Sequence, residues 1–130
     1  MKNLVLTLSL AITASITVQA RQAEPPLVQA NRLMDKAVGL LGNASERSLQ
    51  EARELAERAK SIFAKYEERD MKFLAARIIA VSYNDEGRHE ESRHAAQAML
   101  EDARRANTPL WEASALCTIH LVNRAPHWSS

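Results

Sequence analysis

Residues 82–92 read SYNDEGRHEES, and this stretch decides how the chain folds. It contains four carboxylates, one histidine and the only glycine beyond residue 42. It is either a site that does chemistry, such as a metal loop or an acid/base pair, or the corner between two helices. Glycine readily adopts the left-handed conformation that ends a helix, and carboxylates placed just after it complement the dipole of the next helix. We therefore interpret the stretch as a helix corner at Gly87.

The spacing of its polar residues argues against the chemical alternatives. His89 and His94 are five positions apart, which separates them by roughly 140° around a helix, whereas the two-histidine zinc helix needs a spacing of four. The run at 85–87 lacks the alternating acidic ligands of a calcium loop. No nucleophile, base and orienting group can be assembled anywhere in the chain. The sequence therefore predicts neither an enzyme nor a cofactor or metal site.

Prolines, glycines and cap residues divide the sequence on both sides of this corner into five helices. Asn43 or Ser45 is expected to cap the second helix and Asp70 the third, and Thr108 with Pro109 opens the fifth. No segment has the pattern of a strand. The expected helices are 26–41, 46–67, 71–85, 88–106 and 109–123.

The helices alternate in character and repeat at an offset of 40 residues. Charged residues fill 12 of 24 positions in 46–69 and 8 of 19 in 88–106, but only 2 of 13 in 71–83 and 1 of 15 in 109–123. In the same register Glu51-Ala52-Arg53 recurs as Glu91-Ser92-Arg93. Alternation of an amphipathic with a largely apolar helix, at such a period, is typical of stacked helical hairpins.

With these features the chain resembles a tetratricopeptide repeat (TPR) protein. The resemblance covers about residues 46–123, and its period is nearer 40 than the 34 residues of the family. It implies an all-α fold in which antiparallel hairpins stack as a short right-handed superhelix. The residues that match the family pattern, at the spacing of the family, are Ala76, Ile79, Ala80, Tyr83, Gly87, Glu91, Ser92 and Ala96.

The resemblance also implies a concave groove, lined by the first helix of each hairpin, that holds a peptide or a helix of a partner. Arg77 and Arg124 are rare charges on largely apolar helices, and each can pair with a carboxylate of a partner or has only a local structural role. Carried over by register, the candidate groove residues are Leu74, Arg77, Val81, Asn84, Ser114, Cys117, Leu121 and Arg124.

The first twenty residues differ in kind from the rest. Lys2 is their only charge, an apolar run softened by hydroxyls follows, and Val18-Gln19-Ala20 fits a cleavage site for export. We expect a signal peptide at 1–20, a helical domain at 21–124, a short tail at 125–130 and an exported protein, periplasmic or secreted. Association with a membrane is expected only if the signal segment stays uncleaved.

Charge and single residues limit the partners further. Removal of residues 1–20 leaves 16 basic against 16 acidic residues without a block of one sign, which disfavours nucleic acid. Cys117 is the only cysteine, either a buried small hydrophobic residue or an intermolecular link. His120 is expected to be partly buried with one hydrogen-bond partner, and Asn43 begins a formal glycosylation sequon that also suits a helix cap.

Three hypotheses for the function follow. The leading one is an exported TPR-like adaptor that binds another protein or a peptide. The second is a self-associating structural module, such as a homodimer, that uses Leu110, Trp111, Leu121 and Val122. The third is a small helical metal- or ligand-binding protein that uses His89, His94 or His120.

Overall fold

The described part of the chain, residues 24–43 and 45–124 of a computed structural model, is all-α, with five helices and no strand. The signal segment expected at 1–20 and the tail at 125–130 lie outside these residues. None of the five helices is long and apolar enough to span a membrane. The helices are α2 (Pro26–Leu41), α3 (Glu46–Lys65), α4 (Arg69–Asp85), α5 (His89–Arg105) and α6 (Pro109–Arg124).

Three of the turns between helices share one backbone geometry. The middle residue of each turn has a positive φ: 58° at Glu67, 85° at Gly87 and 52° at Asn107. The amide that follows bonds back to a carbonyl five residues earlier, in the pattern of a Schellman motif. These bonds are Glu68 N to Phe63 O at 2.9 Å, Arg88 N to Tyr83 O at 2.8 Å and Thr108 N to Ala103 O at 3.1 Å. The corner at Gly87 is therefore confirmed as one of three equivalent helix stops.

The offset of 40 residues is also present in the structure. Helix α3 ends at Lys65 and α5 at Arg105, whereas α4 begins at Arg69 and α6 at Pro109. Burial follows the same register, because Ala75, Ile78 and Ser82 of α4 are buried like Ala115, Thr118 and Val122 of α6. The second hairpin is thus a structural copy of the first, which supports a helical-repeat architecture.

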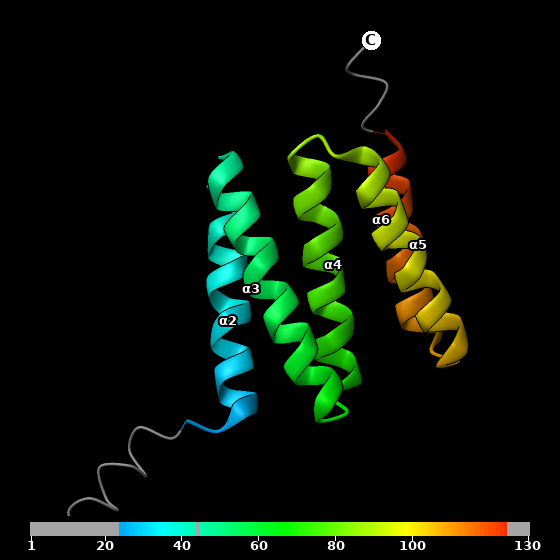
Figure 1. Ribbon diagram of the computed structural model, residues 1–130. Coiled ribbons are helices and arrows are strands. Elements are labelled where there is room, and N and C mark those ends of the chain that lie inside the picture. The colour runs from blue at the N-terminus through cyan, green and yellow to red at the C-terminus, as the bar shows by residue number, and fades with distance from the viewer. Residues whose placement is uncertain (1–23, 44, 125–130) are drawn as a thin grey trace, which may run out of the picture.

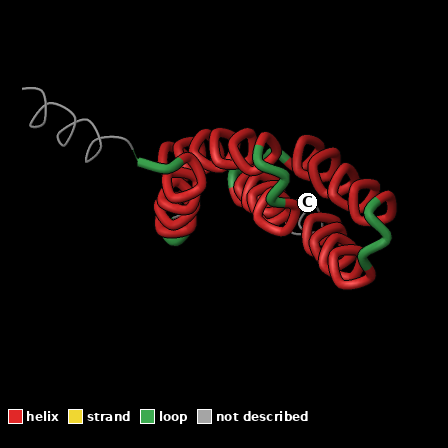
Figure 2. The backbone as a smooth tube through the Cα atoms, turned by 90° about the horizontal axis from the view of Figure 1, so that it is seen from below, coloured by secondary structure: helices red, strands yellow, loops and turns green. Residues whose placement is uncertain are grey.

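The helices form two layers. Each helix packs on the next one in the chain, and α4 also contacts both α2 and α6. Viewed along the helices, α3 and α5 lie in one layer and α2, α4 and α6 in the other (Figure 2). Figure 1 shows the same molecule from the side of α3 and α5, with α4 visible between them.

The core divides into two clusters that meet on α4. The first lies between α2, α3 and α4 and includes Met34, Phe63 and Ile79, whereas the second lies between α4, α5 and α6 and includes Phe73 and Met99. Both clusters are rich in fully buried alanines. Alanine leaves room for close approach of helices, which explains how a chain with few aromatic residues builds a packed interior.

Candidate functional site

The candidate groove residues on α4 occupy one face of that helix. Leu74 is 43% exposed and Arg77 is exposed, whereas Val81 and Asn84 are half-buried. Residues three and four apart lie on the same side of a helix, so these side chains form a continuous strip. The two core clusters and α5 cover the other sides of α4, and this strip is the side that the described helices leave open.

The equivalent residues on α6 are at least as open. Cys117 and Arg124 are exposed, Leu121 is 49% exposed and Ser114 is half-buried. Helices α4 and α6 are in contact, and Figure 1 shows that they run in the same direction. The eight residues therefore form two neighbouring strips, which we call the α4/α6 face.

The α4/α6 face has both apolar and positively charged groups without local partners. Neither Arg77 nor Arg124 forms a salt bridge with any residue in the described part of the chain. The prediction that Arg77 pairs with a neighbouring glutamate is thus wrong for the described residues. An exposed guanidinium beside apolar side chains suits a carboxylate of a partner.

Two expectations for α6 are wrong, and for the same reason. Cys117 is a free, exposed cysteine and not a buried hydrophobic residue, and His120 is exposed and not partly buried. Helix α6 packs on α5 and α4 and has no later helix on its other side within the described residues. An apolar composition indicated complete burial, but a helix at the end of the described stack is covered on fewer sides.

The corner at Gly87 contains a buried ion pair that the sequence did not reveal. Arg53 Nη1 on α3 lies 2.7 Å from Glu86 Oε2, and the two side chains are 10% and 6% exposed. Gln50 Nε2 donates to Glu86 Oε1 at 3.2 Å. The Arg53 guanidinium lies 4.1 Å from the ring centroid of Tyr83, and that of Arg88 lies 4.9 Å from it, within cation–π range.

The environment of Glu86 favours its charged form. Burial raises the pKa of Glu86, but hydrogen bonds from Arg53 and Gln50 and the charges of Arg53 and Arg88 together lower it below its usual value. Because every group of this network faces another group of the chain, we interpret the network as a clamp between α3 and the α4–α5 turn. The acidic residues of the corner are structural.

The histidines do not gather into a metal site in the described residues. His89 and His94 lie on α5 and His120 on α6, and the described part of the chain holds no group of three or more histidine, cysteine or acidic residues that could bind an ion. The prediction that Asp70 caps the third helix is wrong, because α4 begins at Arg69 and Asp70 lies within its first turn. Of the alternatives for α3, Ser45 is the cap, since its side chain accepts from Ser48 N at 3.1 Å.

The chain was compared with protein-family models, with curated proteins and with solved structures, and none of the three comparisons finds a match.

Proposed function

We propose that the protein is an exported, TPR-like adaptor, periplasmic or secreted, that binds an acidic, extended segment of another protein on the α4/α6 face. In this proposal the hairpins continue as a short right-handed superhelix, and the α4/α6 face is its concave side. The observation that carries the proposal is the combination, on one open face, of Leu74 and Leu121 with two arginines that have no salt bridge within the described residues.

The chemistry of the face suits such a ligand. A peptide that lies along the face covers the exposed leucines, which removes apolar surface from water. Carboxylates of the peptide then pair with Arg77 and Arg124 in hydrogen bonds that the charges strengthen. The face is defined by helix register, so its residues are held in place before a partner arrives, which reduces the entropic cost of binding.

Site-specific photo-crosslinking in cells tests the proposal. A benzoylphenylalanine at position 121 is expected to capture a defined partner, whereas the same group at position 58, an exposed site on α3, captures none. Arg77→Glu/Arg124→Glu is expected to abolish the crosslink. The matched control, Arg47→Glu/Arg58→Glu, makes the same change of charge at two exposed sites on α3. Equal crosslinking from both positions, or equal loss in both variants, would contradict the proposal.

Self-association is the second candidate function, and the exposed leucines of α6 favour it. Leu110, Leu116 and Leu121 are 78%, 47% and 49% exposed. The predicted dimer surface changes, however, because Val122 lies in the core and Trp111 is half-buried against Phe73. We expect light scattering to show a dimer that Leu110→Glu/Leu116→Glu converts to a monomer. A monomer at high concentration would contradict this candidate.

A further inference from the structure

A cleft with a positively charged rim and an aromatic floor lies on a different side of α4 from the α4/α6 face. Its volume is about 290 Å³, and it opens between α3 and α5 over the first turns of α4. Small-molecule sites are usually concave and of roughly 300 to 1,000 Å³, so the cleft is large enough for a small ligand. Its lining residues are Lys60, Arg69, Lys72, Phe73, Ala76, Met99, Asp102, Arg105, Ala106 and Trp111.

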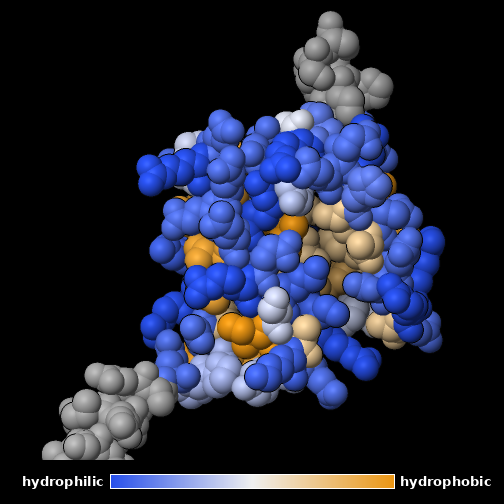
Figure 3. Space-filling model, viewed as in Figure 1, coloured by the Kyte–Doolittle hydropathy of each residue, from blue (hydrophilic) through white to orange (hydrophobic). Residues whose placement is uncertain are grey.

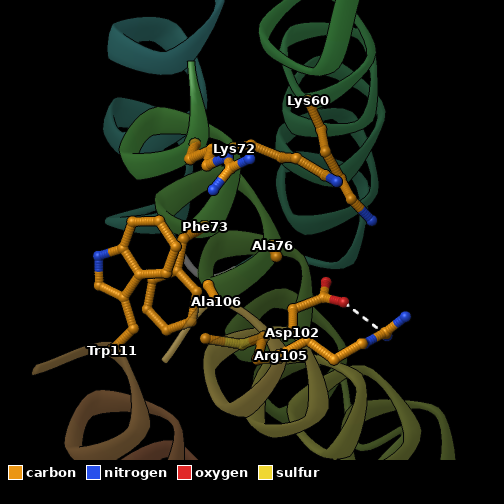
Figure 4. Close-up of a pocket in the computed structure, with 10 residues that line it drawn as sticks. Lys60, Lys72, Phe73, Ala76, Asp102, Arg105, Ala106 and Trp111 are labelled. Carbon is orange, nitrogen blue, oxygen red and sulfur yellow. Dashed lines mark hydrogen bonds and ion pairs between the residues drawn. The ribbon is translucent and has the colours of Figure 1, made fainter. Parts of the chain in front are cut away.

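The floor of the cleft is a stacked aromatic pair. The ring centroids of Phe73 and Trp111 are 5.2 Å apart with an interplanar angle of 10°. Phe73 is 7% exposed, whereas Trp111 is half-buried and offers the open part of its indole to the cleft. Figure 4 shows the two rings on one side of the cleft and Lys60 and Lys72 on the other, with Ala76 between them.

Positive charge dominates the rim. Four cationic side chains line the cleft against one carboxylate, Asp102, which already pairs with Arg105 at 2.8 Å. Lys60, Arg69 and Lys72 form no salt bridge within the described residues. Like charges that share one cleft repel each other, and a bound anion relieves that repulsion.

The position of two of these cations is unfavourable for the helix itself. Arg69 and Lys72 lie at the beginning of α4, which has no side-chain cap, and cations there oppose the helix dipole. Asp70, the acidic residue of the same turn, does not line the cleft. An anion between these two residues would compensate both the cationic side chains and the helix end.

The cleft residues are also those that depart from the 40-residue repeat. Lys60 corresponds to Leu100, Arg69 to Pro109 and Phe73 to Ala113. Positions that serve only to stack the hairpins keep their character between the copies, as Ala56 and Ala96 do. The charges and the aromatic floor therefore belong to this one place in the molecule. Figure 3 shows apolar surface between α3 and α5 with charged side chains around it.

We propose that this cleft binds a small organic anion, a carboxylate or phosphate attached to a flat apolar body. The apolar body lies on the indole of Trp111 and against Ala76 and Met99. The anionic group faces Lys60, Arg69 and Lys72. This site is separate from the α4/α6 face, so it does not depend on the adaptor function.

Tryptophan fluorescence and calorimetry test the proposal with naphthoate as the probe. The protein has two tryptophans, and Trp128→Phe leaves Trp111 as the only reporter. Naphthoate is expected to change the Trp111 emission and to bind at least about tenfold more tightly than neutral naphthamide, because the charged group gains hydrogen bonds to the lysines. Added salt weakens the carboxylate and leaves the amide unchanged.

Matched variants locate the site. Lys60→Met/Lys72→Met is expected to weaken naphthoate by about tenfold or more. Lys36→Met/Lys65→Met removes the same charge at two exposed sites and is expected to leave binding within about twofold, as for surface charges in general. Circular dichroism checks that both variants fold.

Three results would overturn the assignment. Equal affinity for naphthoate and naphthamide would remove the role of the anion, and this comparison needs no variant. Inorganic phosphate that competes as well as naphthoate binds would remove the role of the apolar body. Binding of neither probe at millimolar concentration would reject the site altogether.

Discussion

At the scale of single residues, the three equivalent turns place different side chains under the same backbone demand. The left-handed position is held by Glu67, Gly87 and Asn107 in turn. Glycine and asparagine tolerate this conformation, whereas a glutamate there is strained by its β-carbon. Glu67 is thus a local weakness in an otherwise well-ended helix.

Glu67→Gly is expected to stabilise the protein by about 0.5–1 kcal/mol, because it relieves the left-handed strain. Chemical denaturation at equilibrium measures the effect. Gly87→Ala is expected to cost about 1 kcal/mol by the reverse argument, and a β-carbon at this position meets no atom within 4 Å, so its loss comes from the backbone alone. Glu68→Gly, with a φ of −83° at that residue, is the matched control. A stabilising Glu68→Gly would contradict the explanation.

The buried Arg53–Glu86 pair predicts a dependence of stability on pH. The pKa of Glu86 is lower in the folded protein than its ordinary value of 4.5. Its contribution to stability is therefore fully present above that ordinary value and is lost as the pH falls through the folded value. Glu86→Gln is expected to cost about 3 kcal/mol at neutral pH, because it leaves a buried arginine uncompensated. The difference from the parent, measured by denaturation, shrinks below about pH 4.5.

Asp85 and a double variant serve as controls for this prediction. Burial raises the pKa of Asp85, so that carboxyl favours the folded state as the pH falls, and subtraction of the parent curve cancels its effect. Arg53→Met/Glu86→Leu removes both charges, and we expect it to cost less than Glu86→Gln alone. A difference between Glu86→Gln and the parent that stays constant down to pH 3 would contradict the proposed linkage, even though the turn could still be intact.

The sequence could not reveal this pair, for a physical reason. Arg53 and Glu86 are 33 residues apart, and each belongs to a segment rich in both signs of charge. Patterns along one helix identify which face is apolar, but they do not indicate which of several carboxylates a neighbouring helix covers. The acidic corner was correctly predicted as a turn, whereas the burial of one of its glutamates depends on the packing of α3.

At the scale of elements, one buried hydroxyl connects α4 with α5. Ser92 Oγ donates to the carbonyl of Ala80 at 2.7 Å, and both residues are fully buried. The equivalent position in the first hairpin is Ala52, so the pocket itself accepts a methyl group. Ser92 therefore adds a polar contact where the repeat needs only a small side chain.

Ser92→Ala is expected to lower the free energy of unfolding by about 1 kcal/mol, the usual net value of one hydrogen bond. Ser61→Ala is the matched control, because Ser61 is exposed and its hydroxyl bonds only to the Glu57 carbonyl of its own helix. Its effect is expected to stay within about 0.5 kcal/mol. Equal losses in the two variants, measured by thermal and chemical denaturation, would show that the contact between helices adds nothing.

Helix bounds were predicted closely where a residue with special backbone chemistry marks them. Pro26, Gly87 and Pro109 fixed the beginning of α2, the end of α4 and the beginning of α6 as expected. The turn after α3 was predicted less well, because glutamate at its left-handed position gives no signal. The beginning of α4 was consequently assigned two residues late and its cap to Asp70.

At the scale of the whole molecule, α4 makes the two core clusters interdependent. Ile79 packs in the first cluster and Phe73 in the second. Helices that contact only their neighbours can unfold separately if each interface is independent. A helix that is shared by both clusters opposes this, so we expect one cooperative unit.

Met99→Ala tests this cooperativity from one side. Met99 is 1% exposed in the second cluster, and truncation of a buried methionine costs about 2–5 kcal/mol. Hydrogen exchange is expected to show the same loss of protection in α3 as in α5. Protection that falls in α5 while α3 keeps its parent value would show two independent units.

The candidate sites were accessible from the sequence to different degrees. The strip on α4 follows from register alone, because Leu74, Arg77 and Val81 share one side of a helix. The cleft over Phe73 does not, because its cations come from three helices and appear in the sequence as ordinary solvated charges. Its one signal is negative: the positions at which the second copy of the hairpin fails to reproduce the first.

The common geometry of the three turns has a consequence for construction. A block that runs from one left-handed position to the one after next, residues 67–106, begins and ends at the same backbone state. Such a block is an interchangeable cassette, and a duplicate of it placed after residue 106 would meet at each junction the conformation it already has. The chain can therefore be lengthened hairpin by hairpin, with the number of cassettes as the only design variable.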